Sequence, residues 1–228
     1  MAKYVLKFSK EGYFKYTSHL DLLRFFKRSF KRAGIKLDYS QGFNPHPKMG
    51  FAQPLSLGYS SIYELLEFET SQNDSPEDMK NKLNAMMPEG ILILGCAVYK
   101  EEGKSLAALA EAAEYMICIP LEVKSLGGKT CAELCDEFLS QEQIFAKKKQ
   151  KKSKELVEID IKSKIIRLNF ADANDQLIIS ASLDAGSESN LSPELLIEAI
   201  IKFWKIDISR NDIDVMRKKL LFSNGFSI

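Results

Sequence analysis

The pattern of apolar and polar positions in the first hundred residues predicts a mixture of strands and helices. Apolar side chains alternate with polar ones in some stretches, which is typical of half-buried strands, and recur at helical spacing in others. The predicted strands are 4–8, 51–57, 62–70 and 91–98, with a strand-like stretch at 36–40, and the predicted helices are 18–33 and 75–87. Strand, helix, two strands, helix and strand is the order of a ferredoxin-like unit, whose two helices pack on one face of an antiparallel sheet.

The second half of the chain repeats this outline. A Ser-Pro-Glu sequence opens a helix in each half, at Ser75 and at Ser192, with proline in the first helical turn. The predicted elements are strands at 115–123, 144–149, 157–168, 176–183 and 215–222, and helices at 130–141 and 192–204. We therefore predict an α+β fold of two tandem ferredoxin-like (βαββαβ) units, with a first domain at 1–100, a linker at 101–114 and a second domain at 115–228.

The helix predicted at 18–33 separates an apolar face from a basic one. Ser18 followed by Asp21 has the form of a capping signal, and Gly34 supplies a stop after the last turn. The apolar face consists of Leu22, Leu23, Phe26, Phe30 and Ala33, and the basic face of Arg24, Lys27, Arg28, Lys31 and Arg32. We expect the first face to pack in the core and the second to be exposed, either as a solvated surface or as the contact for a partner.

Charge is distributed unevenly along the chain. The formal net charge is +1, yet the first fifty residues contain eleven Lys or Arg residues against three acidic ones, a net charge of +8. The remainder therefore carries −7. Such segregation indicates that the N-terminal part meets a polyanion or an acidic protein surface.

The loop at 41–50 is a second candidate binding element. It holds two prolines and two glycines, which fix its backbone rather than loosen it. The side chains that it offers are an aromatic ring, an amide, an imidazole and an ammonium, at Phe43, Asn44, His46 and Lys48. This mixture suits a binding site in which a ring stacks, polar groups form hydrogen bonds and a lysine contacts phosphate. The alternative is a stiff crossover with an ordinary exposed histidine.

His19 is the second of the two histidines in the chain that could carry chemistry. We expect it in the first turn of the helix at 18–33, where the helix dipole disfavours a protonated imidazole. A neutral imidazole is what a general base requires, and Tyr13 and Tyr16 lie just upstream. A simple packing role for His19 is an equal alternative.

Motifs for redox, nucleotide or metal chemistry are absent from the sequence. There is no glycine-rich phosphate loop and no nucleophile elbow. Two histidines and four scattered cysteines lack the paired spacing of a metal site, so we predict neither a metal nor a cofactor. The cysteines are too few for a disulfide framework, and no apolar run approaches the ~20 residues of a membrane span. We therefore expect a soluble cytoplasmic protein without a membrane contact.

A lysine-rich segment lies at 147–154, with six lysines in eight residues. We expect a solvated hairpin tip that holds a phosphate backbone loosely, through release of counterions rather than reading of sequence. It would be a second, weaker contact than the basic helix face.

Five stretches of the chain carry a resemblance to a known family. They are TSHLDL at 17–22, AGI at 33–35, YSQGFNPHPK at 39–48, PLSLG at 54–58 and AAEY at 112–115. Together they resemble the radical SAM-linked protein family, a bacterial domain found alone or attached to the C-terminal end of radical SAM proteins. The match is specific over 1–70 and diffuse beyond it. The cluster motif of radical SAM chemistry is missing here, so the resemblance implies a radical SAM protein as partner rather than radical chemistry in this chain.

These observations lead to one main functional prediction and two alternatives. The main one is an accessory protein that binds RNA through the basic helix face and the loop at 41–50, and that works with a radical SAM enzyme in RNA modification or processing. One alternative is a protein-interaction adaptor that binds no RNA. The other is a metal-independent endoribonuclease, suggested by similarity in fold to CRISPR RNA-processing enzymes, with His19 as acid or base, Tyr16 beside it and Lys48 stabilising the phosphorane.

Overall fold

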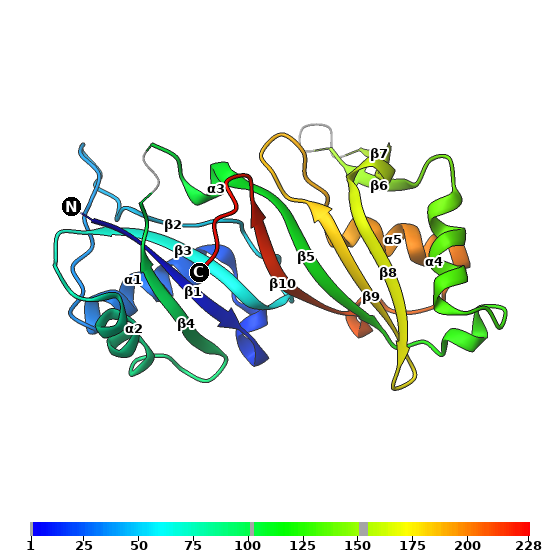
Figure 1. Ribbon diagram of the computed structural model, residues 1–228, viewed down its shortest axis with the longest axis horizontal. Coiled ribbons are helices and arrows are strands. Elements are labelled where there is room, and N and C mark those ends of the chain that lie inside the picture. The colour runs from blue at the N-terminus through cyan, green and yellow to red at the C-terminus, as the bar shows by residue number, and fades with distance from the viewer. Residues whose placement is uncertain (1, 101–102, 151–154) are drawn as a thin grey trace. The chain divides into compact units, whose positions relative to one another are not determined.

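The computed structural model describes residues 2–100, 103–150 and 155–228 of a mixed α+β protein (Figure 1). The chain divides into two compact units: unit 1 comprises Met1–Ala110 with Arg217–Ile228, and unit 2 comprises Glu111–Met216. The last twelve residues, which the sequence analysis placed in the second domain, therefore cluster with unit 1. The last strand, β10 (Asp214–Phe222), begins in unit 2 and ends in unit 1.

Unit 1 is built on an antiparallel sheet with strand order β4-β1-β3-β2. Its strands are β1 (Ala2–Lys10), β2 (Met49–Phe51), β3 (Ser60–Thr70) and β4 (Ile91–Val98), and its helices are α1 (His19–Arg32), α2 (Pro76–Asn84) and the short α3 (Leu106–Leu109). A 3-10 helix, η1 (Gly12–Tyr16), precedes α1. Helix α3 lies within the segment that was predicted as a linker, of which residues 101–102 are outside the described residues.

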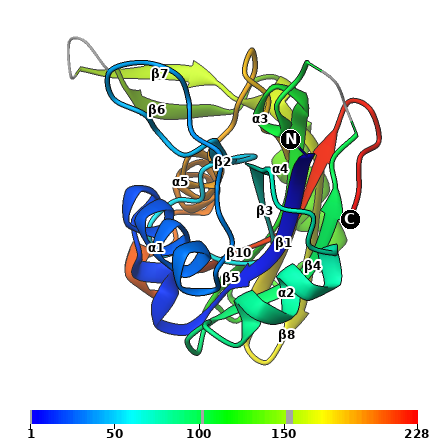
Figure 2. The ribbon, with the colours of Figure 1, turned by 90° about the vertical axis from the view of Figure 1, so that its left-hand side faces the viewer.

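The core of unit 1 lies between one face of this sheet and the two longer helices (Figure 2). Alternation along the strands places every second side chain on that face, and the helical period brings the apolar stripe of each helix onto it. The buried residues are Tyr4, Leu6 and Phe8 of β1, Leu66 and Phe68 of β3, Leu22, Phe26 and Phe30 of α1, and Met79 and Leu83 of α2. The predicted apolar face of the helix at 18–33 is thereby confirmed as its packing face.

Unit 2 contains an antiparallel sheet with strand order β5-β9-β8 and a separate hairpin of β6 and β7. Its elements are β5 (Ala110–Ile119), η2 (Val123–Ser125), α4 (Cys131–Ser140), β6 (Phe145–Lys149), β7 (Leu156–Asp160), η3 (Lys162–Lys164), β8 (Ile165–Ala173), β9 (Gln176–Asp184), α5 (Pro193–Trp204) and η4 (Arg210–Asp212). The turn between β8 and β9 has positive φ at Asn174 and Asp175, as a tight hairpin turn requires. Phe138 of α4 stacks on Trp204 of α5, with ring centroids 5.7 Å apart.

Several predicted elements differ from the observed ones for local reasons. The strand predicted at 51–57 is a strand only at Phe51, because Pro54 has no N–H to donate to a neighbouring strand. The strand-like stretch at 36–40 forms only two isolated bridges, from Leu37 and Tyr39. The strand predicted at 157–168 is interrupted by η3, so that its first part pairs with β6 and its second with β9. None of the helices in the described ranges is long and apolar enough to cross a membrane.

Candidate functional site

The basic face of α1 is held outward by the packing of the opposite face. Ser18 caps the helix, since its Oγ accepts a hydrogen bond from the Asp21 N–H at 3.2 Å. Asp21 in turn accepts from Arg24 Nη1 at 3.0 Å. The five basic side chains predicted for this face, Arg24, Lys27, Arg28, Lys31 and Arg32, are all exposed. Among the described residues, Arg28, Lys31 and Arg32 form no ion pair, although the charge of Arg28 helps to lower the pKa of Asp21.

A buried lysine fixes the chain just before α1. Lys10 is 1% exposed, and its Nζ donates to the backbone carbonyls of Lys15 and Thr17 at 3.2 and 3.1 Å. Burial lowers the pKa of this ammonium, an effect that Glu64 partly offsets. The two carbonyls belong to η1 and to the residue before the cap. Lys10 therefore fixes the segment that connects β1 to the start of α1.

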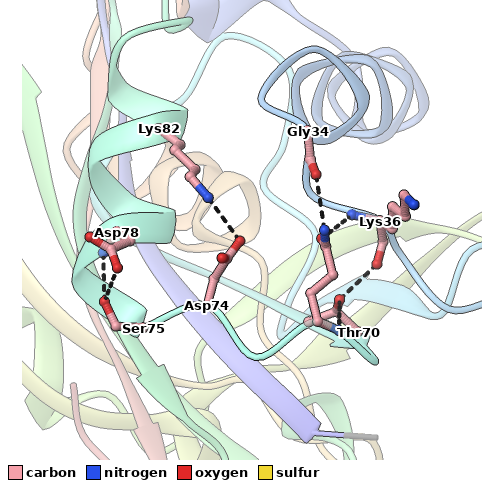
Figure 3. Close-up of polar contacts among 8 residues, drawn as sticks. Gly34, Lys36, Thr70, Asp74, Ser75, Asp78 and Lys82 are labelled. Atoms are coloured by element: carbon pink, nitrogen blue, oxygen red, sulfur yellow. Dashed lines mark hydrogen bonds and ion pairs between the residues drawn. The ribbon is translucent and has the colours of Figure 1, made fainter.

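The C-terminal end of α1 is tied to the segment that follows β3. Gly34 has φ of +74°, which lets the chain reverse after the last helical turn. The Gln72 side chain accepts from the Lys36 N–H at 2.6 Å and donates to the Gly34 carbonyl at 3.3 Å. Thr70 Oγ1 donates to the Lys36 carbonyl at 2.7 Å (Figure 3). These bonds use the backbone of Lys36 and leave its side chain exposed.

Two hydrogen bonds between Ser40 and His46 close the base of the loop at 41–50. The Ser40 N–H donates to the His46 carbonyl at 2.9 Å, and the His46 N–H donates to Ser40 Oγ at 3.0 Å. Beyond this base, Phe43, Asn44 and His46 are exposed, and Phe43 is exposed completely. The loop thus presents an aromatic ring to solvent at its tip, where burial gives no reason for one.

Two hollows that share Lys27 lie along the basic face of α1, and the loop at 41–50 lines the first of them. The first, of about 270 Å³ and called here the loop groove, is lined by Leu23, Arg24, Lys27, His46, Pro47 and Met49. The second, of about 460 Å³ and called here the heel pocket, is lined by Lys27, Phe30, Lys31, Gly34, Ile35, Lys36, Leu37 and Tyr39. Lys27 belongs to both. None of the described residues that line the two hollows is a carboxylate, and the charged ones among them are all lysines or arginines, apart from the titratable His46.

The three residues considered for catalysis are not joined to one another. His19 packs its ring edge-on against Phe51, with centroids 5.2 Å apart, and burial lowers the pKa of its imidazole. This is the direction that the sequence predicted, although burial is the cause rather than the helix dipole. Tyr16 is exposed beside Lys15, and Lys48 forms an ion pair with Glu69 at 2.6 Å. Within the described part of the chain, no hydrogen bond or ion pair links these three side chains.

Lys48 differs from the other loop residues in its surroundings. Its ion pair with Glu69 raises the pKa of its ammonium, and both side chains line a small polar hollow with Lys3 and Glu67. The charge of Lys48 is therefore compensated within the chain. Of the lysine-rich segment, Lys147, Lys148 and Lys149 lie on β6 of unit 2 and are all exposed, whereas 151–154 lie outside the described residues.

Tyr39 and Lys36 line the heel pocket but were not among the predicted site residues. Their signal in the sequence was weak, since both belong to a stretch that alternates like a strand. The reversal at Gly34 is what brings them opposite Lys27 and Lys31, and a reversal cannot be read from alternation. No group of three or more His, Cys, Asp or Glu residues in the described ranges is placed to hold a metal ion.

Fold and site together define an α+β protein that presents a positively charged groove on one of its two units. The chain belongs to the bacterial family described as "uncharacterized protein conserved in bacteria" (DUF2344), whose model matches residues 3–193. The fold is similar to that of a chain in the crystal structure of a Cbf5–Nop10–Gar1 complex, with a TM-score of 0.51 and 10% identity over 95% of this chain. This chain covers 48% of that one, and the likeness is one of fold alone. No curated protein matches the sequence.

Proposed function

We propose that this protein is a cytoplasmic accessory protein that binds RNA through unit 1 and works with a radical SAM enzyme in RNA modification or processing. The observation that carries the RNA part is the coincidence of cations that form no ion pair with hollows along α1. Arg28, Lys31 and Arg32 form no ion pair within the described chain, and none of the described residues that line the loop groove and the heel pocket is a carboxylate. Positive charge outside ion pairs attracts a phosphate backbone by counterion release.

The loop at 41–50 adds the means to recognise bases. Phe43 offers a free ring for stacking, and Asn44 and His46 offer hydrogen-bonding groups next to the cations. RNA-binding proteins read unpaired bases with this combination, in which cations position the backbone and rings and amides contact the bases. Lys48 has a lesser part in this proposal, since Glu69 already neutralises it.

We also infer that each unit follows the ferredoxin-like order. In unit 1 the antiparallel order β4-β1-β3-β2, with α1 and α2 on one face, supports this arrangement. In unit 2 the order β5-β9-β8 supports it if the hairpin of β6 and β7 is an insertion between α4 and β8. The link to a radical SAM enzyme rests on the sequence resemblance over 1–70.

The test is ultraviolet cross-linking of the full chain to RNA in its own cells, followed by stringent purification and sequencing of the attached RNA. The variant to compare combines Arg28→Glu and Arg32→Glu on α1. The matched control combines Lys218→Glu and Lys219→Glu, two exposed lysines on β10 that receive the same change in charge. We expect a discrete RNA that is lost from the α1 variant and retained by the control.

Purified protein gives a second measure of the same contact. The α1 variant should bind the recovered RNA more weakly and with a salt dependence reduced by about 2 in the log–log slope, since two phosphate contacts are removed. The proposal would be overturned if the wild type and both variants recovered no more RNA than background. Proteins that co-purify after nuclease treatment, and that the α1 variant loses, would then identify the face as a protein-docking surface.

A further inference from the structure

We propose that the heel pocket holds one unpaired nucleobase, stacked on the ring of Tyr39, with the phosphates on either side of it held by Lys27, Lys31 and Lys36. This inference rests on the proposed function and goes beyond it, because it assigns a base-binding pocket to a particular place in the fold. It also predicts that the bound RNA is single-stranded at this point.

The lining of the pocket specifies the chemistry of its occupant. Its floor is apolar, formed by Phe30 and Ile35, which are almost fully buried, and by Leu37. Its described lining adds three ammonium groups, of Lys27, Lys31 and Lys36, and no carboxylate. An occupant must therefore combine a flat apolar part with negative charge at its edge, and a nucleotide has both.

Tyr39 supplies the surface on which a base can stack. Tyr39 is 45% exposed, and Lys27 Nζ lies over its ring, 5.7 Å from the centroid. A partly exposed aromatic ring beside a cation is a stacking platform of the kind used for unpaired bases. Because Lys27 also lines the loop groove, a strand that leaves the pocket passes directly along Arg24 and His46.

The volume of the heel pocket decides between a single base and a base pair within a helix. About 460 Å³ is the size of a small-ligand site, which admits a base with its sugar. A base pair within an A-form helix is too large to enter it. The pocket therefore favours loops, bulges or ends, the parts of RNA in which bases are available.

The pocket is held in shape before anything binds. The Ile35 N–H donates to the Phe30 carbonyl at 2.9 Å, and Gln72 and Thr70 fix the backbone of Lys36 on the far side. Figure 3 shows Gly34 and Lys36 linked to this neighbouring segment. A preformed pocket loses less conformational entropy on binding than one that must fold around its ligand.

The test uses the purified full chain and a hairpin RNA with 2-aminopurine in its loop, whose fluorescence falls when the base stacks. Three variants are compared with the wild type: Tyr39→Leu removes the ring, Tyr39→Phe keeps it, and Tyr13→Leu removes an exposed ring that lines neither the heel pocket nor the loop groove. We expect quenching and affinity to be lost with Tyr39→Leu, by roughly ten-fold in affinity, and to be retained with Tyr39→Phe. The salt dependence should stay unchanged in Tyr39→Leu, because no phosphate contact is removed.

A second variant, Lys36→Gln, tests the pocket independently in case Tyr39→Leu does not fold. Lys36→Gln alters only an exposed ammonium on the rim, and it should weaken binding of the same hairpin and reduce its salt slope by about 1. A fully paired duplex of the same length should show neither effect. Adenosine monophosphate as competitor distinguishes a free nucleotide from RNA: RNA should be displaced only at large molar excess.

The outcomes separate this inference from the proposed function. RNA binding that depends on Arg28 and Arg32 but is unchanged by Tyr39→Leu and Lys36→Gln would overturn the base pocket and leave the RNA-binding surface intact. Equal binding of duplex and loop would do the same. Failure of the wild type to bind any RNA, with tight binding of adenosine monophosphate, would overturn both and identify a nucleotide site.

Discussion

The basic residues of α1 and those of unit 2 differ in what they contact. In unit 2 three cations on or beside helices form ion pairs with glutamates: Lys129 with Glu137 at 2.9 Å, Lys202 with Glu158 at 3.3 Å and Arg210 with Glu194 at 2.6 Å. Of the five basic residues on the exposed face of α1, Arg24 forms an ion pair, with Asp21. Arg28, Lys31 and Arg32 form no ion pair among the residues that the structure describes.

The difference teaches that composition alone does not locate a binding surface. A cation whose charge is compensated by a neighbouring carboxylate contributes to the fold and offers little to a polyanion. A cation without such a partner contributes little to the stability of the fold, and its charge is available to attract a polyanion. Substitutions that separate stability from binding therefore test the distinction, and the deepest ion pair of unit 1 gives the strongest contrast.

Arg217→Met should produce the largest loss of stability. The Arg217 guanidinium donates to both carboxylate oxygens of Glu64, at 2.8 and 2.6 Å, and the two side chains are 1% and 3% exposed. Removing the guanidinium leaves the buried Glu64 carboxylate without its hydrogen-bonded ion pair, with Lys10 as a more distant cation, at a cost of about 3–5 kcal/mol in the free energy of unfolding. Urea denaturation measures it.

Two comparisons make the Arg217 result decisive. Arg32→Met makes the same chemical change on the exposed face of α1 and should alter stability by no more than about 0.5 kcal/mol. The double variant Arg217→Met with Glu64→Leu should recover much of the lost stability, because an apolar pair needs no compensation. Equal effects of Arg217→Met and Arg32→Met would show that pairing does not separate the two kinds of cation.

The two faces of α1 could be predicted from the sequence because both are local. The apolar repeat, the Ser18 cap and the stop at Gly34 all lie within about a turn of the residues that they affect, and the structure has each of them. The hairpin of β8 and β9 is predictable for the same reason, since the polar pair Asn174 and Asp175 forms the turn between two strands adjacent in sequence.

The buried ion pair and the heel pocket could not be predicted from the sequence, because each depends on residues far apart in the chain. Glu64 and Arg217 are separated by 153 positions, and each looks like an ordinary surface charge within a strand. The heel pocket needs Gly34 to reverse the chain and Gln72 to hold it. Neither the reversal nor the partner can be inferred from hydrophobic periodicity, which carries no information on which segments meet.

Ser18→Ala should destabilise the protein by roughly 1 kcal/mol. Ser18 is the cap that accepts from Asp21 N–H, and Asp21 holds Arg24 in turn. This prediction places the stability of α1 in its cap and its apolar face rather than in its cations. Thermal unfolding of Ser18→Ala beside Ser18→Thr, which keeps a hydroxyl that can accept from the Asp21 N–H and donate to its carboxylate, measures this loss. A cap that contributes nothing would give equal melting temperatures for both variants and the wild type.

Arg210→Met should have a smaller effect, below about 1 kcal/mol, because the Arg210–Glu194 pair is partly exposed and screened by solvent. The pair has good geometry, with two hydrogen bonds at 2.7 and 2.6 Å, so the effect should still exceed that of Arg32→Met on α1. A double-mutant cycle with Glu194→Gln isolates the interaction in urea denaturation. A coupling of zero would remove Arg210 from the group of cations that support the fold.

His19 gives the smallest expected effect, seen only as a dependence of stability on pH. Burial against Phe51 lowers the pKa of its imidazole below the ordinary 6.5, so the folded chain resists protonation more than the unfolded chain does. Stability should therefore be complete above pH 6.5 and decline as the pH falls from there through the lowered pKa of the folded state. His19→Asn should show a smaller loss of stability between pH 7.5 and pH 5 than the wild type, in urea denaturation at the two values. His46→Asn is the matched control, because it removes the other, exposed histidine of the same unit. The prediction is wrong if the loss of stability at low pH persists in His19→Asn and disappears in His46→Asn.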